Sequence, residues 1–362
     1  MNSNIYNFKN DIVASHPNNN PLKDTVHVIR WLPGTKSTIF VAGGWDGRLR
    51  AYQFEQRGNQ SVLEMGPCLD FGVPVLAVEW ISKGEVIVGL ASGGLVAVSF
   101  NNNSQNELYK ANAPVADIRY FQTNSEKILL VFLMNDTILI HNMSSNDRFP
   151  STDLKLRHCI IAADMYDDLV AIAMAGSLFA VVSVEDLVKN NSNNINYTKS
   201  ELTSALSSIS ICNTGSKKLI ALASIDGRIN KGEVSRLSSG GYKFDSQIIF
   251  RAHKESPSSS RDLDVLFPIS GCHFSGSSIN NGQSLASCSS RGDLLIWDFS
   301  KKENALHIET KMDVSTCRFN QDGTLLAYAL GYSWGKGIWG LKDVNYPPQI
   351  YVHIVDKNDL QC

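Results

Sequence analysis

The sequence lacks the long apolar runs of membrane proteins. An uncharged and strongly apolar stretch, residues 169–184, is shorter than the ~18–20 apolar residues that a helix needs to cross a bilayer. The small residues Ala175, Gly176 and Ser177 at its centre suit a hairpin turn. Residues 1–15 contain no apolar segment of the kind that directs a chain to secretion. We therefore expect a soluble, intracellular protein that binds no membrane, in which residues 169–184 form two buried strands.

Patterns that bind metals or support catalysis are also missing. The seven cysteines are scattered with no CxxC pair, and the eight histidines do not form a ligand-spaced pair. The pattern HExxH and the P-loop do not occur. The sequence thus predicts free thiols in a reducing compartment, with no disulfide framework, metal site or cofactor. It does not predict an enzyme.

A strong excess of charge of either sign is absent as well. The chain has 33 Lys and Arg against 35 Asp and Glu, which gives a formal net charge of −2. This balance argues against nucleic-acid binding that depends on overall basicity, although a local basic segment can still bind. The segment 251–266, RAHKESPSSSRDLDVL, is such a candidate. Low-affinity contact with single-stranded RNA is therefore a secondary expectation.

What the sequence does contain is a repeated hairpin. In residues 40–55, FVAGGWDGRLRAYQFE, the dipeptide Asp46-Gly47 lies between two strand-like runs and suits the positive φ of a tight turn. Six further segments share the order of apolar strand, small or polar turn and apolar strand, and another alternating segment precedes each of them. Turn residues of six of these units are Gly47, Gly94, Asp136, Gly176, Gly227 and Gly292. Most spacings are near 40–50 residues, which is typical of the four-stranded blades of a β-propeller.

These repeats predict an all-β fold, a seven-bladed WD-repeat β-propeller. A Trp-Asp pair that ends a third strand occurs once, at Trp297-Asp298, so the prediction depends on periodicity more than on motif. We expect one domain over residues 1–362, and the C-terminal segment 349–355 would be the third strand of the last blade. The N-terminal segment would supply its fourth strand and so remove an exposed edge. The predicted ranges are 1–14 for the closing strand and 24–55, 74–100, 114–143, 156–184, 205–250, 266–300 and 312–355 for the blades.

Antiparallel pairing places alternate connections of a blade on the same side of the disc. With the strands counted a to d from the axis outward, the b–c turns and the d–a connections between blades share one face. The candidate site residues on this face are Trp45, Arg228, Trp334 and Lys336 in b–c turns and Arg251, His253 and Lys254 in the d–a insertion 251–266. Aromatic and basic side chains together suit a surface that docks an acidic peptide.

Several of these candidates also have a purely structural interpretation. Trp45 can fold back over its own hairpin, and Arg228 can pair with a neighbouring aspartate. His253 can link an outer strand to the adjacent blade, and Lys336 can be a solvated surface lysine. The prediction of a docking surface therefore depends on their shared face and not on any one residue.

Four segments resemble one family of propellers, the mRNA-export and mitotic-checkpoint WD-repeat proteins, with the poly(A) RNA export branch favoured. They are AGGWDGRLRAYQ (42–53), SIDGR (224–228), FRAHK (250–254) and CRFNQDGTLLAYALGYSWGKG (317–337). The resemblance implies a seven-bladed propeller that binds an acidic GLEBS motif of a nucleoporin or of a checkpoint kinase. It links Trp45 and Arg228 to that surface and matches residues 251–254 to a basic element of the family. Lys254 stands where the family has arginine, which loses bidentate contact with a carboxylate.

The same resemblance implies the cellular role. We expect a non-catalytic scaffold that docks a GLEBS-type nucleoporin peptide and acts in mRNA export at the nuclear pore. The chain would be a monomer in a hetero-complex, located in the nucleus and at the nuclear envelope pore and also in the cytoplasm. The alternative is a spindle-assembly-checkpoint propeller that binds Bub-type kinases at kinetochores. Blade three departs from the family, because LMNDT (133–137) stands where a second Trp-Asp turn is usual.

Overall fold

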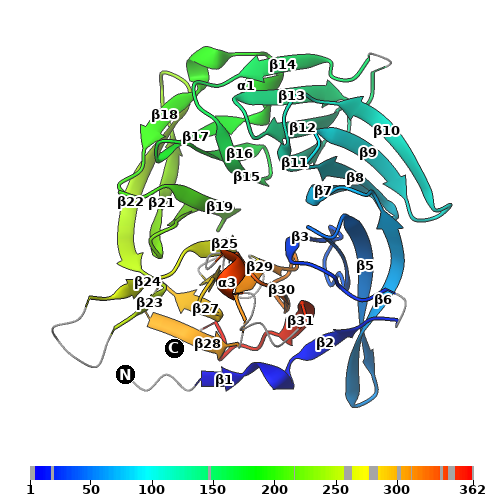
Figure 1. The fold of residues 1–362 in the computed structure, drawn as a ribbon. Helices are drawn as coiled ribbons and strands as arrows, with labels where there is room; N and C mark the ends of the chain where they lie inside the picture. Colours follow the sequence, from blue (N-terminus) through cyan, green and yellow to red (C-terminus); the bar gives the residue numbers. More distant parts are fainter. Residues whose placement is uncertain are drawn as a thin grey trace.

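The structure is a computed structural model that describes residues 5–17, 20–145, 148–215, 217–256, 263–276, 284–299, 303–310, 312–334, 337–340 and 347–360. Its regular structure is almost entirely β, and the sheets are arranged in a ring around a common axis (Figure 1). The helices in these residues are short: α1 (Val184–Val188), α3 (Gly337–Gly340) and the 3-10 helices η1 (Phe8–Asn10) and η2 (Ser192–Asn194). The predicted all-β propeller is therefore confirmed.

The sheets repeat one antiparallel order of four strands from the axis outward. The first strands are β3 (Val26–Trp31), β7 (Val75–Ser82), β11 (Val115–Gln122), β15 (Ile160–Tyr166), β19 (Leu206–Asn213), β25 (Ile269–Phe274) and β29 (Val314–Phe319). The second strands are β4 (Ile39–Gly44), β8 (Glu85–Leu90), β12 (Lys127–Leu133), β16 (Leu169–Met174), β20 (Lys218–Ser224), β26 (Ser284–Ser289) and β30 (Leu325–Leu330).

The third strands are β5 (Arg48–Arg57), β9 (Gly94–Ser99), β13 (Thr137–Asn142), β17 (Leu178–Ser183), β21 (Arg228–Arg236), β27 (Asp293–Asp298) and β31 (Gln349–Ile354). The outer strands are β6 (Gln60–Asp70), β10 (Ser104–Lys110), β14 (Thr152–Lys155), β18 (Asn196–Lys199), β22 (Tyr242–Arg251), β28 (Glu303–Glu309) and the N-terminal β2 (Ile12–Ser15). Three short strands complete the set: β1 (Ile5–Asn7), β23 (Lys254–Glu255) and β24 (Val265–Leu266).

The first strands of neighbouring sheets contact one another around the axis, and β29 contacts β3, so the ring is closed. We interpret the sheets as seven blades and number them from the first strands, from blade 1 at β3 to blade 7 at β29. The predicted blade boundaries remain predictions. Most of the predicted ranges end before the outer strand of the blade begins.

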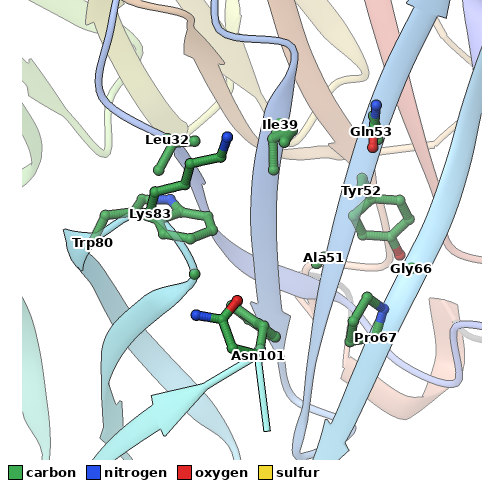
Figure 2. Close-up of a pocket in the computed structure, with 12 residues that line it drawn as sticks. Leu32, Ile39, Ala51, Tyr52, Gln53, Gly66, Pro67, Trp80, Lys83 and Asn101 are labelled. Atoms are coloured by element: carbon green, nitrogen blue, oxygen red, sulfur yellow. The ribbon is translucent and has the colours of Figure 1, made fainter. Parts of the chain in front are cut away.

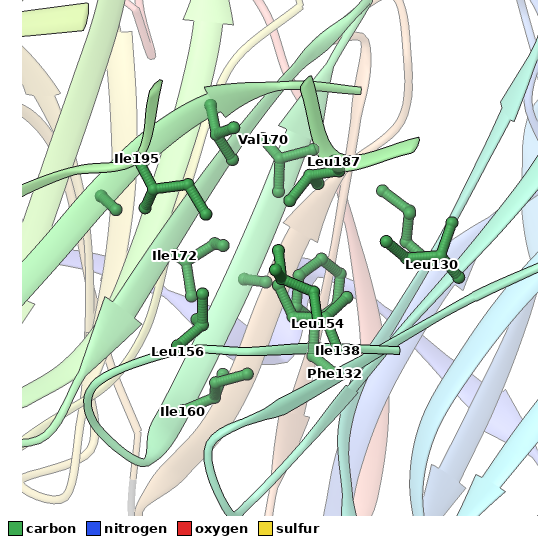
Figure 3. Close-up of a cluster of buried hydrophobic side chains, with 14 of the residues drawn as sticks. Leu130, Phe132, Ile138, Leu154, Leu156, Ile160, Val170, Ile172, Leu187 and Ile195 are labelled. Carbon is green, nitrogen blue, oxygen red and sulfur yellow. The ribbon is translucent and has the colours of Figure 1, made fainter. Parts of the chain in front are cut away.

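The core lies between the blades. One apolar cluster joins blades 3 and 4, with Leu130 and Phe132 of β12 facing Val170 and Ile172 of β16, and Leu187 of α1 covers it (Figure 3). Because every sheet has a neighbour on both faces, second strands are buried along nearly their whole length instead of on alternate residues. All six residues of β16 are buried, for example.

Residues 169–184 form two buried strands, as the sequence predicted. Strands β16 and β17 pair in an antiparallel hairpin that turns at residues 175–177. Within the ranges that the structure describes, no helix is both long enough and apolar enough to cross a membrane.

The N-terminal segment closes the ring. Strand β2 pairs antiparallel with β31, with Ile12 opposite Val352, as the sequence predicted. It then continues in parallel alongside β6 of blade 1, with Ala14 opposite Leu63. The preceding strand β1 pairs in parallel with β28 of blade 6. Residues 5–15 therefore touch three blades, 1, 6 and 7 (Figure 1).

The structure differs from the sequence-based expectation at the outer strands. Asn-rich residues 101–107 and 189–200 look like connections between blades, yet they contain the start of β10 and the whole of β18. Most side chains of β10 are exposed, so the strand shows no apolar alternation. An outermost strand is held chiefly by backbone hydrogen bonds to its neighbour, and these leave little signal in the sequence.

Candidate functional site

The turns between second and third strands lie beside the connections between blades. In each blade the backbone N–H of the first turn residue donates to a carbonyl that precedes the first strand, at 2.8–3.2 Å. The donor and acceptor pairs are Trp45 and Thr25, Ala91 and Pro74, Met134 and Pro114, Ala175 and Cys159, Ile225 and Ala205, Ser290 and Pro268, and Gly331 and Asp313. These bonds place the b–c turns and the d–a connections on one surface, which we call the turn face.

Three of these equivalent donor positions carry large exposed apolar side chains. Trp45 is 50% exposed, Met134 is 39% exposed and Ile225 is 50% exposed. The indole of Trp45 meets the ring of His27 edge-on, with centroids 6.2 Å apart, and half of its surface stays accessible. Met134 belongs to LMNDT, so in blade 3 methionine occupies the position that tryptophan has in blade 1. Met134 and Ile225 were not predicted from the sequence. Alignment of the repeats would have identified them, because they occupy the same turn position as Trp45.

Other exposed apolar side chains add to this face. Of the 13 large apolar residues that are exposed in the described ranges, those on the turn face are Trp45, Met134, Ile225, Leu263, Val265, Trp334, Ile338 and Trp339. Trp334 is 52% exposed and has a φ of 60°, which an aromatic residue rarely adopts. Its ring packs near Tyr332, with centroids 5.4 Å apart. A concentration of exposed apolar surface of this kind is typical of faces that bind a partner.

The predicted cations of the turn face are placed beside carboxylates. Arg228 begins β21, and its Nε lies 3.3 Å from an Asp226 oxygen. Arg251 and Lys254 both reach the same oxygen of Asp264, at 3.4 Å and 3.2 Å. Because the single Asp264 carboxylate pairs with both cations, Arg251, Lys254 and Asp264 together carry a net positive charge. Lys336 lies outside the described residues.

His253 does not lie on the surface, which corrects its prediction as a partner contact. The residue is 1% exposed, and burial lowers its pKa. Its Nε2 lies 2.8 Å from Ser287 Oγ. The same oxygen accepts a hydrogen bond from the indole N–H of Trp297 at 2.9 Å. Its Nδ1 lies 4.0 Å from Asp293. His253 therefore links the connection after β22 to blade 6, in agreement with the structural role considered for it above. It also anchors the exposed Lys254 next to it.

A second group of charged residues lies on the first strands near the axis. Arg30 of β3 donates to Asp117 of β11 at 2.9 Å, and Arg119 and Arg318 each donate to Asp164 of β15 at 3.1 Å. Burial raises the pKa of Asp117 to about 7, while the positive charge of Arg30 opposes the shift. These pairs join blades 1, 3, 4 and 7, so we assign them to holding the ring together. In the described part of the chain, no group of three or more His, Cys, Asp or Glu residues is placed to hold a metal ion.

Comparison with known proteins supports the fold and the resemblance. No protein-family model matches the chain. The mRNA export factor GLE2 of Chaetomium thermophilum is 21% identical over 98% of this chain and 92% of its own length. Protein Rae1 of Drosophila melanogaster is 24% identical over 91% and 90%. The spindle assembly checkpoint protein bub3 of Schizosaccharomyces pombe is 20% identical over 85% and 88%.

A solved structure, that of U3-55K, superposes with a TM-score of 0.72 over 96% of this chain and all of its own, at 12% identity. Such a low identity supports the fold alone. The sequence relatives extend over nearly the whole propeller and not over a single repeat. The resemblance predicted from the sequence is thus confirmed: along most of its length this chain is similar to the WD-repeat proteins of the mRNA-export and spindle-checkpoint family, with the export factors prominent among its relatives.

Proposed function

We propose that this chain is a non-catalytic scaffold in mRNA export, located at the nuclear pore, that docks an acidic GLEBS-type segment of a nucleoporin on its turn face. The observation that carries this proposal is the repeat of exposed Trp45, Met134 and Ile225 at equivalent turn positions. The same face carries the cations Arg228, Arg251 and Lys254. The names of the relatives GLE2 and Rae1 support the pathway.

The chemistry of the face suits a peptide with both apolar and acidic residues. Apolar peptide side chains would pack on the exposed turn residues, since buried contact area at a few anchors supplies most binding energy in such interfaces. Carboxylates of the peptide would pair with Arg228, Arg251 and Lys254. The peptide must compete there with Asp226 and Asp264, so electrostatics would contribute more to orientation than to affinity.

The test is binding of a synthetic GLEBS-type peptide to the double variant Trp45→Ala, Arg228→Glu. We expect its affinity to fall at least ~100-fold, because truncation of an aromatic anchor costs about 2 kcal/mol or more and charge reversal adds repulsion. Isothermal titration calorimetry measures the change.

A matched control makes the same kind of change on the opposite face. Leu237→Ala and Lys243→Glu lie at the outer end of blade 5, where Leu237 is 36% exposed and Lys243 is also exposed. This control variant should bind like the unmodified chain. Equal affinity of the turn-face variant and the unmodified chain would contradict the proposed site.

The checkpoint role is the second candidate, and similarity to bub3 favours it. It uses the same face with a kinase segment in place of a nucleoporin segment. Affinity purification from the native cell separates the two candidates, since a nucleoporin or a Bub-type kinase would be recovered. Salt-dependent binding of single-stranded RNA to the 251–266 connection would be an added, weaker activity.

A further inference from the structure

A pocket lies on the face opposite the turn face. A pocket of about 310 Å³ opens between blades 1 and 2, near the ends of the first strands (Figure 2). Leu32 and Ile39 from blade 1 and Trp80 and Phe100 from blade 2 form much of its wall. Lys83 and Gly84 form the turn between β7 and β8, which belongs to the opposite set of connections from Trp45 and Arg228. We call this cavity the interblade pocket.

The wall of the interblade pocket is apolar because its polar atoms are already bonded elsewhere. The indole N–H of Trp80 donates to the Arg30 carbonyl at 3.1 Å, and the Tyr52 hydroxyl lies 2.9 Å from His16 Nε2. Trp80 is 4% exposed and Tyr52 is 1% exposed, so both rings are fixed in the core. The Trp80 and Phe100 rings pack with centroids 5.9 Å apart. A ligand would therefore meet a preformed apolar surface and need not reorder it.

The rim adds a single positive charge. Lys83 is exposed beside Trp80, and among the residues that the structure describes its ammonium group has no ion pair or hydrogen bond (Figure 2). The neighbouring Glu85 carboxylate accepts the Ser82 hydroxyl at 2.7 Å. Gly84 has a φ of +95°, and a Cβ there would come within 2.9 Å of Asn101 Oδ1, so the turn that carries Lys83 packs closely on Asn101. The pocket thus combines an apolar interior with one available cation at its edge.

We propose that the interblade pocket binds a linear peptide segment of a partner protein through one large apolar side chain, aromatic or branched, that is followed by Asp or Glu. The apolar side chain would fill the cavity, and the carboxylate would pair with Lys83. The volume is at the lower end of ligand pockets, roughly 300–1,000 Å³, which fits one anchoring side chain. The proposal is independent of the turn face. It allows the chain to hold two partners at once, on opposite faces.

The experiment follows the six tryptophan indole N–H signals of ¹⁵N-labelled full-length protein by NMR. The probe is N-acetyl-Phe-Glu-amide, and the spectrum of Trp80→Phe assigns the Trp80 signal. We expect that signal to shift and saturate in the millimolar range. N-acetyl-Phe-Gln-amide should bind roughly twofold to fivefold more weakly, because an exposed ion pair contributes little. N-acetyl-Gly-Glu-amide should not shift the signal.

Two variants test the residues themselves. Lys83→Glu should weaken binding of the Phe-Glu probe at least as much as replacement of the probe's glutamate by glutamine does. Gly66→Leu should abolish binding, because Gly66 lines the pocket and a Cβ there has only the Ala51 carbonyl within reach, at 3.8 Å. Lys127→Glu, at the first residue after the corresponding turn of blade 3, is the control and should bind normally. An unmoved Trp80 signal, or equal binding of the Phe-Glu and Phe-Gln probes, would overturn the proposal.

Discussion

Deletion of residues 1–14 is expected to lower the melting temperature by on the order of 10 °C or more. The deletion removes β1, η1 and most of β2, which together touch blades 1, 6 and 7. It leaves the edge of β31 unpaired, and an unpaired edge is also a route to aggregation. Differential scanning calorimetry measures the effect.

The deletion also removes a buried polar network. Asp11, whose side chain is 1% exposed, accepts a hydrogen bond from the Tyr328 hydroxyl at 2.8 Å and lies 2.7 Å from His353 Nδ1. Loss of the Asp11 carboxylate leaves the buried Tyr328 hydroxyl and the buried His353 imidazole without this hydrogen-bond partner. Removal of residues 1–4 alone, which keeps β1 and β2, is the control and should change the melting temperature little. A melting curve that the longer deletion leaves unchanged would contradict closure by the N-terminus.

Replacement of Asp11 by alanine is expected to cost about 3–5 kcal/mol at neutral pH, because it removes the nearer of the two carboxylates that pair with the buried His353. Burial alone would lower the pKa of His353, but hydrogen bonds to Asp11 and Asp359 raise it to about 9. The imidazole is therefore charged in the folded state at neutral pH, and its second nitrogen lies 3.2 Å from Asp359.

The raised pKa fixes the direction of the pH dependence. In the unfolded chain His353 has an ordinary pKa of 6.5, so its stabilising contribution is complete below pH 6.5 and is lost as the pH rises through 9. The difference corresponds to about 3 kcal/mol, since one pKa unit is worth about 1.4 kcal/mol. Unfolding measured from pH 6 to pH 10 should show this loss in the unmodified chain and a much flatter profile in Asp11→Asn.

A surface aspartate provides the comparison. Asp70 pairs with Arg48 at 3.1 Å but has an exposed side chain. Asp70→Asn should cost under about 1 kcal/mol and leave the alkaline profile unchanged. If Asp11→Asn keeps the full alkaline loss of stability, the pairing of His353 with Asp11 does not explain it.

The sequence predicted the inner strands well and the outer strands poorly. Inner strands such as β16 are buried on both faces, so their apolar residues and the turns between them are strong signals. Strand β10 is largely exposed, and its Asn-rich start reads as a loop. The closing strand β2 could be predicted only from the need to complete the last blade, since Ile12–Ser15 is too short for a pattern of its own.

The candidate site shows a similar division. Topology predicted that Trp45 and Arg228 share a face, because that follows from strand count alone. It could not decide whether His253 points outward or inward. That outcome depends on Ser287 and Trp297 of blade 6, which lie 34 and 44 residues further along the chain. The role of Met134 and Ile225 becomes visible only when the repeated hydrogen bonds align the blades.

Hydrogen–deuterium exchange of the full chain, with and without a bound GLEBS-type acidic peptide, tests the docking face most directly. The predicted result is slower exchange at residues 45–47, 134–136 and 225–228, with unchanged exchange at the Lys83 turn on the opposite face. Peptide binding that leaves the three turns unprotected, or that protects only the opposite face, would contradict the assignment of the turn face as the docking surface.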